Sequence, residues 1–507
     1  MVEAGKRGRG THSPSALFLI AAPCKRMLDT GLTRSVLALF YLISDLRILA
    51  QALLPTPCVG YPNGGSADHT EFSGKGVHQH TCISGCVCGR LFLCAFFGGV
   101  TMGMTLRAGV TGAWVMGAML AMGSSVVLAE ANSISEAVTG GKAGLDLRYR
   151  YEYVDQDGID KSAGASTLRT RINFATAPYR GFGAFVEADD VAVIGSERYN
   201  NATGLPSAKT RYPVVADPDG TEINQAWLSY AGLDATTLKF GRQRIIYDNA
   251  RFIGNVGWRQ TEQTYDGFSL SNSSLADATL NYAYVYNVNR IFGEDSPKGD
   301  LDTKAHFVNL AYGGFDLVKI TGYGYFLDLE DAPAASNKTL GLRLTGAPKL
   351  TERTSLSYAL EYARQSDYED GSNIGADYWL AELGVNVGGL QLLGGYELLG
   401  ADDSAFSTPL ATGHAFNGWA DKFLNTPANG LEDLYLQLGG SLAGFKLQAV
   451  YHDVSADKGG ADYGSELDLL AARKFGDVTL VAKYASYNAD EFATDTDKLW
   501  LMAQVAF

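Results

Sequence analysis

The chain lacks cysteine over about its last three quarters. All six cysteines lie near the N-terminus, at Cys24, Cys58, Cys82, Cys86, Cys88 and Cys94. A segment without thiols can cross an oxidising compartment without forming stray disulfides. Apolar runs of about 20 residues, which a membrane-spanning helix requires, are also missing from residues 130–507. Proline is scarce, with 14 residues against 59 glycines. This part of the chain is therefore not expected to be a helical membrane protein.

Residues 102–129 have the features of a secretory signal peptide. A short n-region carries Arg107, the apolar run AGVTGAWVMGAMLAMG follows, and SVVLAEANS ends in small residues. The apolar run is too short for a good membrane span and suits a signal peptide. We expect cleavage after Ala129 or Ala131, with an internal apolar helix as the alternative.

Composition changes sharply at this segment. Residues 1–129 carry 10 Lys+Arg against 5 Asp+Glu, whereas the remainder carries 31 against 50. We interpret residues 1–101 as a doubtful N-terminal extension, upstream of a true start at Met102 or Met104. The alternative is a genuine N-terminal module, in which HQHTCISGCVC could hold zinc. Its spacing matches no C-x-x-C…C-x-x-C pattern.

Residues 130–507 alternate between apolar and polar side chains along many segments. In LDLRYRYEY (145–153), leucines and tyrosines fall on one face and charged residues on the other. LRTRINF, TLGLRLTG, SLSYALEYA, LYLQLGG, FKLQAVYHD and LWLMAQVAF repeat this pattern. A period of two predicts β-strands with one apolar and one polar face.

Strand lengths and connections distinguish a membrane barrel from a soluble sandwich. The pattern predicts eighteen strands, at 143–154, 166–177, 182–191, 221–232, 235–247, 263–271, 276–289, 302–313, 315–328, 337–349, 353–366, 374–387, 389–401, 431–442, 444–455, 462–475, 477–489 and 497–507. Most are long enough to cross a bilayer at a tilt. Short turns such as GLD and FGD alternate with longer polar loops. This predicts an all-β fold: a single transmembrane antiparallel β-barrel of about 18 strands, with short periplasmic turns and longer extracellular loops.

The C-terminus points to the bacterial outer membrane. Phe507 ends an amphipathic last strand, which resembles the C-terminal signature of Gram-negative outer-membrane proteins. Eighteen strands enclose a lumen large enough for an aqueous channel. Trp500 and Phe507 are expected in the aromatic girdles at the membrane surfaces. We therefore predict a bacterial outer-membrane location, reached by export through the inner membrane with a cleaved signal peptide.

Two segments resemble the alginate-export family of outer-membrane porins. They are LKFGRQRIIYDNARFIGNVGWRQTEQTYDGFSL (238–270) and GHAFNGWADKFLNTPANGLEDLYLQ (413–437), and NQAWLSY (224–230) fits the same pattern. The resemblance covers most of residues 140–507. It implies an eighteen-stranded barrel whose lumen, lined by arginines and acids, passes a polysaccharide or another solute. Many members have no link to alginate secretion, so the family does not fix the solute.

Charged side chains on the polar faces are the candidate pore-lining residues. They are Arg148, Arg150, Arg169, Arg171, Arg242, Arg244, Arg251, Arg259, Glu187 and Asp189. The arginines could form a cationic wall that binds passing anions weakly. Alternatively, they pair with acids such as Glu222 or Glu262 and stiffen the barrel. Arg242 and Arg244 share strand parity with Leu238 and Phe240, so an inward orientation requires a bulge or a position at the rim.

Loop 402–430 is the candidate constriction. Its candidate residues are His414, Phe416, Asn417, Trp419, Asp421 and Lys422, which either fold inward or anchor the loop against the rim. The run DQDGID (155–160) resembles part of a calcium loop but lacks the acidic twelfth residue. No metal site and no cofactor are predicted. The net charge of −19 after residue 129 weighs against simple steering of a polyanion.

Two other classes of function stay open beside a channel. A non-conducting structural or adhesive barrel would be plugged, and an outer-membrane hydrolase would need a nucleophile and a base. Residues 130–507 contain three histidines, at 306, 414 and 452, and no G-x-S-x-G motif, so no enzyme is predicted. The expected partners are outer-membrane lipid, lipopolysaccharide and a small or polymeric solute. An anionic polysaccharide such as alginate is one candidate, and nucleic acid is not.

Overall fold

The structure is a computed structural model that describes residues 129–507. The predicted N-terminal extension and almost all of the predicted signal peptide lie outside the described residues, so both stay predictions. In the described range, no helix is long and apolar enough to cross a membrane. A short helix, α4 (Ile134–Thr139), precedes the strands, and the Ser133 hydroxyl caps it by accepting the Glu136 backbone N–H.

The rest of the described chain consists of strands and their connections. The strands are β1 (Lys142–Gln156), β2 (Ala163–Ala175), β3 (Phe182–Arg198), β4 (Gly220–Leu233), β5 (Thr236–Gln243), β6 (Thr264–Asn272), β7 (Ala278–Asn289), β8 (Asp300–Tyr312), β9 (Lys319–Leu327), β10 (Asn337–Gly346), β11 (Lys349–Thr351), β12 (Thr354–Asp367), β13 (Gly375–Val387), β14 (Leu390–Leu399), β15 (Leu431–Leu442), β16 (Phe445–Ser455), β17 (Asp462–Phe475), β18 (Val478–Ala489) and β19 (Thr496–Ala506). Two 3-10 turns, Pro333–Ala335 and Gly413–Ala415, lie in loops.

The sheet closes on itself into a barrel. Each strand pairs antiparallel with its neighbours in the chain, and β1 pairs with both β2 and β19. β11 has three residues and pairs with the start of β12, while β10 pairs with the rest of β12. Without β11, eighteen long strands form the wall. The predicted eighteen-stranded antiparallel barrel is confirmed. Closure pairs the backbone groups that an open edge would leave exposed in lipid.

Connections alternate in length around the barrel. Tight turns join β4 to β5, β13 to β14, β15 to β16 and β17 to β18, each with two residues between the strands. Long loops join β3 to β4, β5 to β6 and β14 to β15. We call the last two loop 244–263 and loop 400–430. The prediction placed the end of β5 at residue 247, but the strand ends at Gln243, where loop 244–263 begins.

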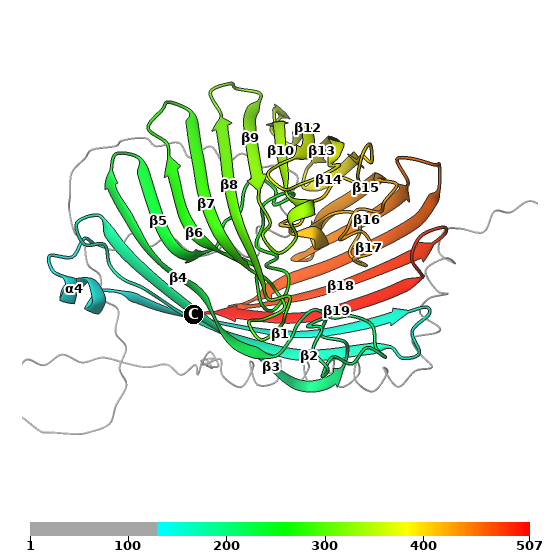
Figure 1. The fold of residues 1–507 in the computed structure, drawn as a ribbon, viewed down its shortest axis with the longest axis horizontal. Coiled ribbons are helices and arrows are strands. Elements are labelled where there is room, and N and C mark those ends of the chain that lie inside the picture. Colours follow the sequence, from blue (N-terminus) through cyan, green and yellow to red (C-terminus); the bar gives the residue numbers. More distant parts are fainter. Residues whose placement is uncertain (1–128) are drawn as a thin grey trace, which may run out of the picture. The chain divides into compact units, whose positions relative to one another are not determined.

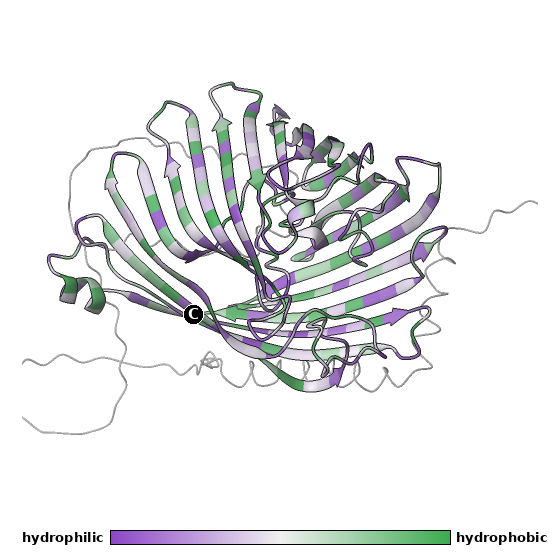
Figure 2. Cartoon of the chain, in the orientation of Figure 1, coloured by the Kyte–Doolittle hydropathy of each residue, from purple (hydrophilic) through white to green (hydrophobic). Residues whose placement is uncertain are grey.

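The two faces of the wall differ as the alternation predicts. On β15, Leu434, Leu436 and Leu438 are about half exposed, whereas Asp433 is buried on the opposite face. Figure 2 shows hydrophobic and hydrophilic bands alternating along the strands. The prediction that Trp500 belongs to an outer girdle is wrong. Its even-numbered position shares the inner face with Lys498 and Met502, and its side chain is fully buried.

The core of the described chain lies inside the barrel. Figure 1 shows the strands curving around an interior that contains loop segments. Loop 244–263 and loop 400–430 meet there, since the Gly254 N–H donates to the Leu410 carbonyl and the Thr412 N–H donates to the Ala250 carbonyl. The largest apolar cluster includes residues of both loops and of the inner wall, among them Phe252, Phe406 and Tyr378. The two loops therefore fill part of the lumen and position the charged site.

Candidate functional site

Arginines of β1 hold the tip of loop 244–263 against the wall. Arg148 is 1% exposed, and its Nε donates to Gln260 Oε1 at 2.9 Å while its other nitrogens donate to loop carbonyls. Arg150 forms an ion pair with Asp217 at 3.0 Å, and its guanidinium lies 4.1 Å from the Trp258 ring centroid. Both arginines point inward, as predicted, but they are covered by the loop.

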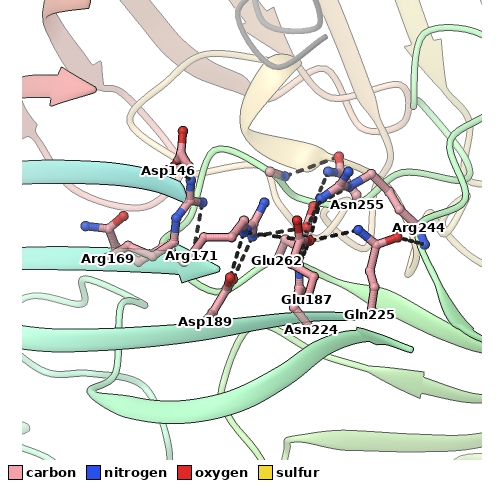
Figure 3. A network of polar contacts seen from close by, with 12 residues as sticks. Asp146, Arg169, Arg171, Glu187, Asp189, Asn224, Gln225, Arg244, Asn255 and Glu262 are labelled. Atoms are coloured by element: carbon pink, nitrogen blue, oxygen red, sulfur yellow. Dashed lines mark hydrogen bonds and ion pairs between the residues drawn. The ribbon is translucent and has the colours of Figure 1, made fainter. Parts of the chain in front are cut away.

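Arginines of β2 lie in ion pairs with acids. Arg171 donates two hydrogen bonds to Asp189, both at 2.6 Å, and contacts Glu262 at 3.1 Å. Arg169 pairs with Asp146 of the neighbouring strand. Figure 3 shows Arg171 between the carboxylate of β3 and that of loop 244–263. This geometry matches the alternative in which the arginines pair with acids inside the barrel.

Glu262 connects loop 244–263 to β2 and β4 and also contacts two residues of the loop itself. It accepts hydrogen bonds from Arg244 Nε at 2.8 Å, from Asn224 at 2.6 Å and from Asn255 at 2.5 Å, besides its contact with Arg171 (Figure 3). Burial alone would raise the pKa of this carboxyl, but Arg244 and Arg171 outweigh it and hold the pKa well below its ordinary value. Glu262 is therefore a carboxylate at neutral pH.

The remaining acids predicted for the lumen lie in the same network. Glu187 accepts hydrogen bonds from Asn224 and Gln225, both at 2.8 Å, and lies 3.4 Å from Arg244. Arg244 follows the end of β5 and turns inward, which resolves the parity conflict for that residue. The loop that begins after Gln243 supplies the change of direction.

The prediction that Arg242 lines the pore is wrong. It pairs across the strands with Ala226 and shares its face with Phe240, which is 58% exposed on the outside. Its partners are Asp266 and Glu294, each at 3.0 Å. Arg242 therefore lies on the outer face near the long-loop end, because β5 keeps its alternation through this residue.

Arg251 anchors loop 244–263 to the opposite side of the barrel. Its Nε donates to Glu397 on β14 at 2.7 Å, and another nitrogen donates to Asn417 Oδ1 at 3.0 Å. Its guanidinium also lies 4.7 Å from the centroid of Phe416. Asn417 adopts a φ of +55°, and its side-chain amide donates to Glu397 at 2.7 Å. These contacts join the two loops to β14.

Asp421 joins the two loops to the opposite part of the wall. It contacts Arg259 of loop 244–263 at 3.0 Å, Lys498 of β19 at 2.8 Å and His414 Nδ1 at 2.7 Å. Burial alone would raise its pKa, but His414, Lys498 and Arg259 together hold the pKa of Asp421 well below its ordinary value. Arg259 also pairs with Glu152 at 3.1 Å.

His414 is a buried neutral imidazole. Burial and the nearby Lys483 keep its pKa well below the ordinary value, although Asp421 favours the protonated form. A neutral ring that donates from Nδ1 to Asp421 can accept at Nε2, and Lys483 Nζ lies 2.9 Å from that atom. The ring also stacks on Trp258 at 4.8 Å.

Lys483 of β18 lies among three tryptophans that come from both loops and the wall. Its Nζ is 3.6 Å from the Trp419 ring centroid, 4.3 Å from that of Trp258 and 5.4 Å from that of Trp500. Each tryptophan face attracts the ammonium electrostatically. We call Lys483 with its three tryptophans and His414 the lysine cage.

Two acids of β17 hold the backbone of loop 400–430. Asp468 accepts the Trp419 N–H at 3.1 Å, and Glu466 accepts the Ala420 N–H at 2.6 Å. Gly418 adopts a φ of +89°, and a Cβ at this position would lie 2.3 Å from the Glu466 carboxylate. Only glycine therefore allows the loop to approach the wall this closely.

The predicted constriction residues thus lie inside the barrel. His414, Asn417 and Trp419 are buried, and Phe416 and Asp421 are partly buried. Lys422 is partly exposed and forms no ion pair with any residue from 129 to 507. Their control of passage stays a prediction.

Lysines near the short-turn end face the lumen without an ion-pair partner among residues 129–507. They include Lys142, Lys239, Lys319, Lys446 and Lys474. Strand alternation places them inward: Lys446, for example, shares its face with the buried Gln448 and His452. The barrel interior therefore has paired arginines towards the long loops and unpaired lysines towards the short turns.

A cavity of about 160 Å³ opens below the start of loop 244–263. Its lining comes from β5, β6, β7 and the loop: Thr237, Lys239, Gln243, Arg244, Ile245, Ile246, Tyr247, Ser269, Leu270, Ser271 and Asn281. No cluster of three or more His, Cys, Asp or Glu side chains suited to a metal ion occurs within residues 129–507.

Sequence reasoning missed the partners that the fold brings to the arginines. Asp217, Gln260 and the lysine cage lie far apart in the chain, and only closure of the barrel with the loops inside brings them together. Alternation alone could have placed Lys483 on the inner face of β18, since it shares that face with the buried Ala485 and Tyr487.

Comparison with known proteins agrees with the fold and with the resemblance in the sequence. Residues 141–392 match the family model described as alginate export. None of the curated proteins matches the sequence.

Solved structures share the barrel at low sequence identity. OccAB4 from Acinetobacter baumannii superposes with a TM-score of 0.58 at 17% identity, covering 72% of this chain and 98% of that one. OccK9 (OpdG) from Pseudomonas aeruginosa gives a TM-score of 0.59 at 14% identity, with coverages of 73% and 99%. At such identity the similarity establishes the fold alone.

Proposed function

Because residues 141–392 match the family model described as alginate export, we propose that this outer-membrane channel passes anionic solutes, with an acidic polysaccharide as the candidate cargo. The observation that carries the proposal is the set of unpaired lysines at the short-turn end of the lumen. Most arginines in the middle of the barrel are already paired with acids, and Arg148 is buried against Gln260 and loop carbonyls, so they add little net attraction for a passing anion.

The charge distribution gives the lysines their role. The chain as a whole is acidic, with a formal net charge of −14, so bulk charge does not draw anions to it. Positive charge inside a narrow, low-dielectric opening acts locally and raises the concentration of anions there. If the short turns face the periplasm, as in other outer-membrane barrels, the lysines lie at the periplasmic entrance.

Release of oligosaccharides from liposomes tests the proposal. Full-length protein from outer membranes would be reconstituted, and efflux of uronate oligomers compared with that of neutral glucose oligomers of equal length. We expect faster efflux of the charged oligomers. Replacing Lys142, Lys446 and Lys474 by methionine should remove that preference and leave efflux of the neutral oligomers unchanged.

A matched control uses lysines that already have acidic partners. Lys209, Lys304 and Lys458 lie at the long-loop end and form ion pairs with carboxylates. Their replacement by methionine should leave the preference intact. Absence of any efflux would favour the second candidate, a non-conducting barrel, whose support is the docking of two loops inside the lumen.

A further inference from the structure

Arg473 is a cation on the outer face of the barrel that lacks an acidic partner. It follows Leu467 and Leu469 on the outer side of β17, whereas Glu466 and Asp468 are buried on the inner side. Within the described part of the chain, its guanidinium makes neither an ion pair nor a hydrogen bond, and its contacts are with aromatic rings. It therefore differs from the lumen arginines, whose charge is neutralised by nearby acids.

Two phenylalanine rings hold this guanidinium in place. Its central carbon lies 4.6 Å from the ring centroid of Phe475 and 5.0 Å from that of Phe445. The two ring centroids lie 6.4 Å apart, and the rings meet edge to face. Ring faces attract a guanidinium but leave its hydrogen-bond donors unused. The cation is therefore fixed in position, with N–H groups that can donate to an acceptor from outside the chain.

Arg473 lies near the periplasmic border of the membrane-facing surface. It precedes the tight β17–β18 turn at Gly476 by three residues, which is about 10 Å along the strand. The β15–β16 turn lies beside it, since a Cβ at Gly444 would be 3.4 Å from Arg473 Nε. Aromatic girdles flank the apolar band of outer-membrane barrels at the membrane surfaces. Phe445 and Phe475 therefore indicate that the guanidinium lies at the depth of the lipid headgroups.

Exposed apolar side chains surround the cation. Leu442 is 69% exposed and pairs with Phe445 across β15 and β16. Val478 is also exposed and pairs with Phe475 across β17 and β18. Acyl chains that cover such side chains remove apolar surface from water, which a free anion does not do. A ligand with both a phosphate and acyl chains therefore uses the cation and the apolar surface together.

We propose that Arg473, Phe445 and Phe475 form a binding site for a phospholipid of net negative charge in the periplasmic leaflet. The lipid phosphate accepts hydrogen bonds from the guanidinium, whose planar fork of N–H groups suits phosphate oxygens. A zwitterionic lipid carries its own ammonium, which competes with Arg473 for the phosphate. The inference is independent of the proposed function, because the site lies outside the lumen.

Native mass spectrometry of the full-length protein, stripped of lipid in detergent, measures this binding. The probes are phosphatidylglycerol, phosphatidylethanolamine with the same acyl chains, and glycerol 3-phosphate as a headgroup without chains. We expect phosphatidylglycerol to bind about fivefold more tightly than phosphatidylethanolamine, which is the size of effect that one exposed ion pair supplies. Equal affinity for the two lipids would overturn the proposal. Glycerol 3-phosphate that binds as tightly as phosphatidylglycerol would indicate a site for a free anion and would overturn the assignment to lipid.

Substitutions assign the binding to Arg473. Arg473→Met should weaken phosphatidylglycerol binding about fivefold, down to the affinity of phosphatidylethanolamine. Arg473→Lys keeps the charge without the planar fork, so its affinity should be intermediate. Phe475→Leu should also weaken binding, because the guanidinium loses one of the rings that fix its position. Unchanged phosphatidylglycerol binding in Arg473→Met would overturn the site.

Arg353→Met is the matched control. Arg353 is an exposed arginine in the short turn between β11 and β12, with no ion pair or ring contact within residues 129–507. Its replacement should leave the affinity for phosphatidylglycerol unchanged. Equal losses in Arg353→Met and Arg473→Met would mean general attraction of anionic lipid by charge and would overturn the site.

Single-channel conductance distinguishes a lipid site from an effect on the lumen. Conductance of Arg473→Met should equal that of the unsubstituted protein, because the side chain lies on the outer face. A changed conductance would show that Arg473 acts on the channel and would overturn its assignment to lipid. Heat-modifiable migration on gels shows whether each variant is folded, and Arg473→Gln serves in place of Arg473→Met if the methionine variant is not.

Discussion

Cations inside the barrel fall into two groups with different surroundings. Arg171 has Asp189 at 2.6 Å and Glu262 at 3.1 Å, whereas Lys239 has only the Trp227 ring. A planar guanidinium suits bidentate pairing and is costly to bury alone. The arginines therefore position the loops, and the lysines near the short turns keep their charge available to a solute.

Substitution of Glu262 tests whether the ion-paired arginines and acids hold the loops in position. Replacing it by glutamine leaves Arg171 and Arg244 without one buried carboxylate, so the free energy of unfolding should fall by about 3–5 kcal/mol. Urea unfolding of the protein in lipid vesicles measures this. Glu294→Gln removes an exposed partner of Arg242 and should cost about 1 kcal/mol or less. Equal costs would contradict the structural role of Glu262.

We predict that Lys422 makes the channel sensitive to pH. Burial and the nearby Lys498 lower the pKa of Lys422 to about 8, although Glu466 favours its charged form. The side chain is therefore charged below pH 8 and loses its charge as the pH rises through that value. Since the folded state releases this proton more readily than the unfolded chain, the charged form also costs stability below pH 8.

The expected result is a decline in preference for anions between pH 7 and pH 9. Reversal potentials in a salt gradient measure the preference. Lys422→Met should show a smaller decline, because methionine has no charge to lose. Lys458→Met, at an exposed lysine paired with Asp457, is the control and should keep the full decline. An unchanged pH profile in Lys422→Met would exclude the residue from the conduction path.

At the scale of elements, the lysine cage joins both inward loops to β18 and β19. Trp258 comes from loop 244–263, Trp419 and His414 from loop 400–430, and Trp500 from β19. Each cation–π contact contributes about 0.5–2 kcal/mol. Removing the ammonium should therefore loosen both loops at once.

Single-channel recording of Lys483→Met tests the cage. We expect larger or fluctuating conductance, because loops that leave the wall obstruct the lumen less. Arg473→Met is a matched control, since Arg473 also lies over two rings, Phe445 and Phe475, but at the outer face. Conductance identical to that of the unsubstituted protein would show that the loops stay in place without the cage.

Strand alternation made most of the barrel predictable from the sequence. The period of two located all eighteen long strands, because each strand needs one face for lipid and one for the lumen. The site was less predictable. Arg148 and Arg169 could be placed inward by parity, but their partners Gln260 and Asp146 depend on the path of a loop and on the register between β1 and β2. Arg242 was misassigned because β5 does not bulge before it ends.

At the scale of the whole molecule, the barrel wall faces lipid on its outer side and the lumen on its inner side. Leu436 lies in the middle of β15, is 54% exposed and faces lipid, whereas Gln437 faces inward. Leu436→Arg should lower the free energy of unfolding by about 2–4 kcal/mol if the residue lies at the bilayer midplane. Gln437→Arg should cost far less. Urea unfolding in vesicles would reveal equal costs if this orientation were wrong.

The reversal potential of the full-length protein in a planar bilayer with a tenfold potassium chloride gradient tests the central claim most directly. A lumen with unpaired lysines at one end and arginines paired with acids in its middle should prefer chloride. We therefore expect a reversal potential of the sign given by anion selectivity, and a shift towards zero when Lys142, Lys446 and Lys474 are replaced by methionine. A cation-selective channel, or a membrane without conductance, would contradict the account.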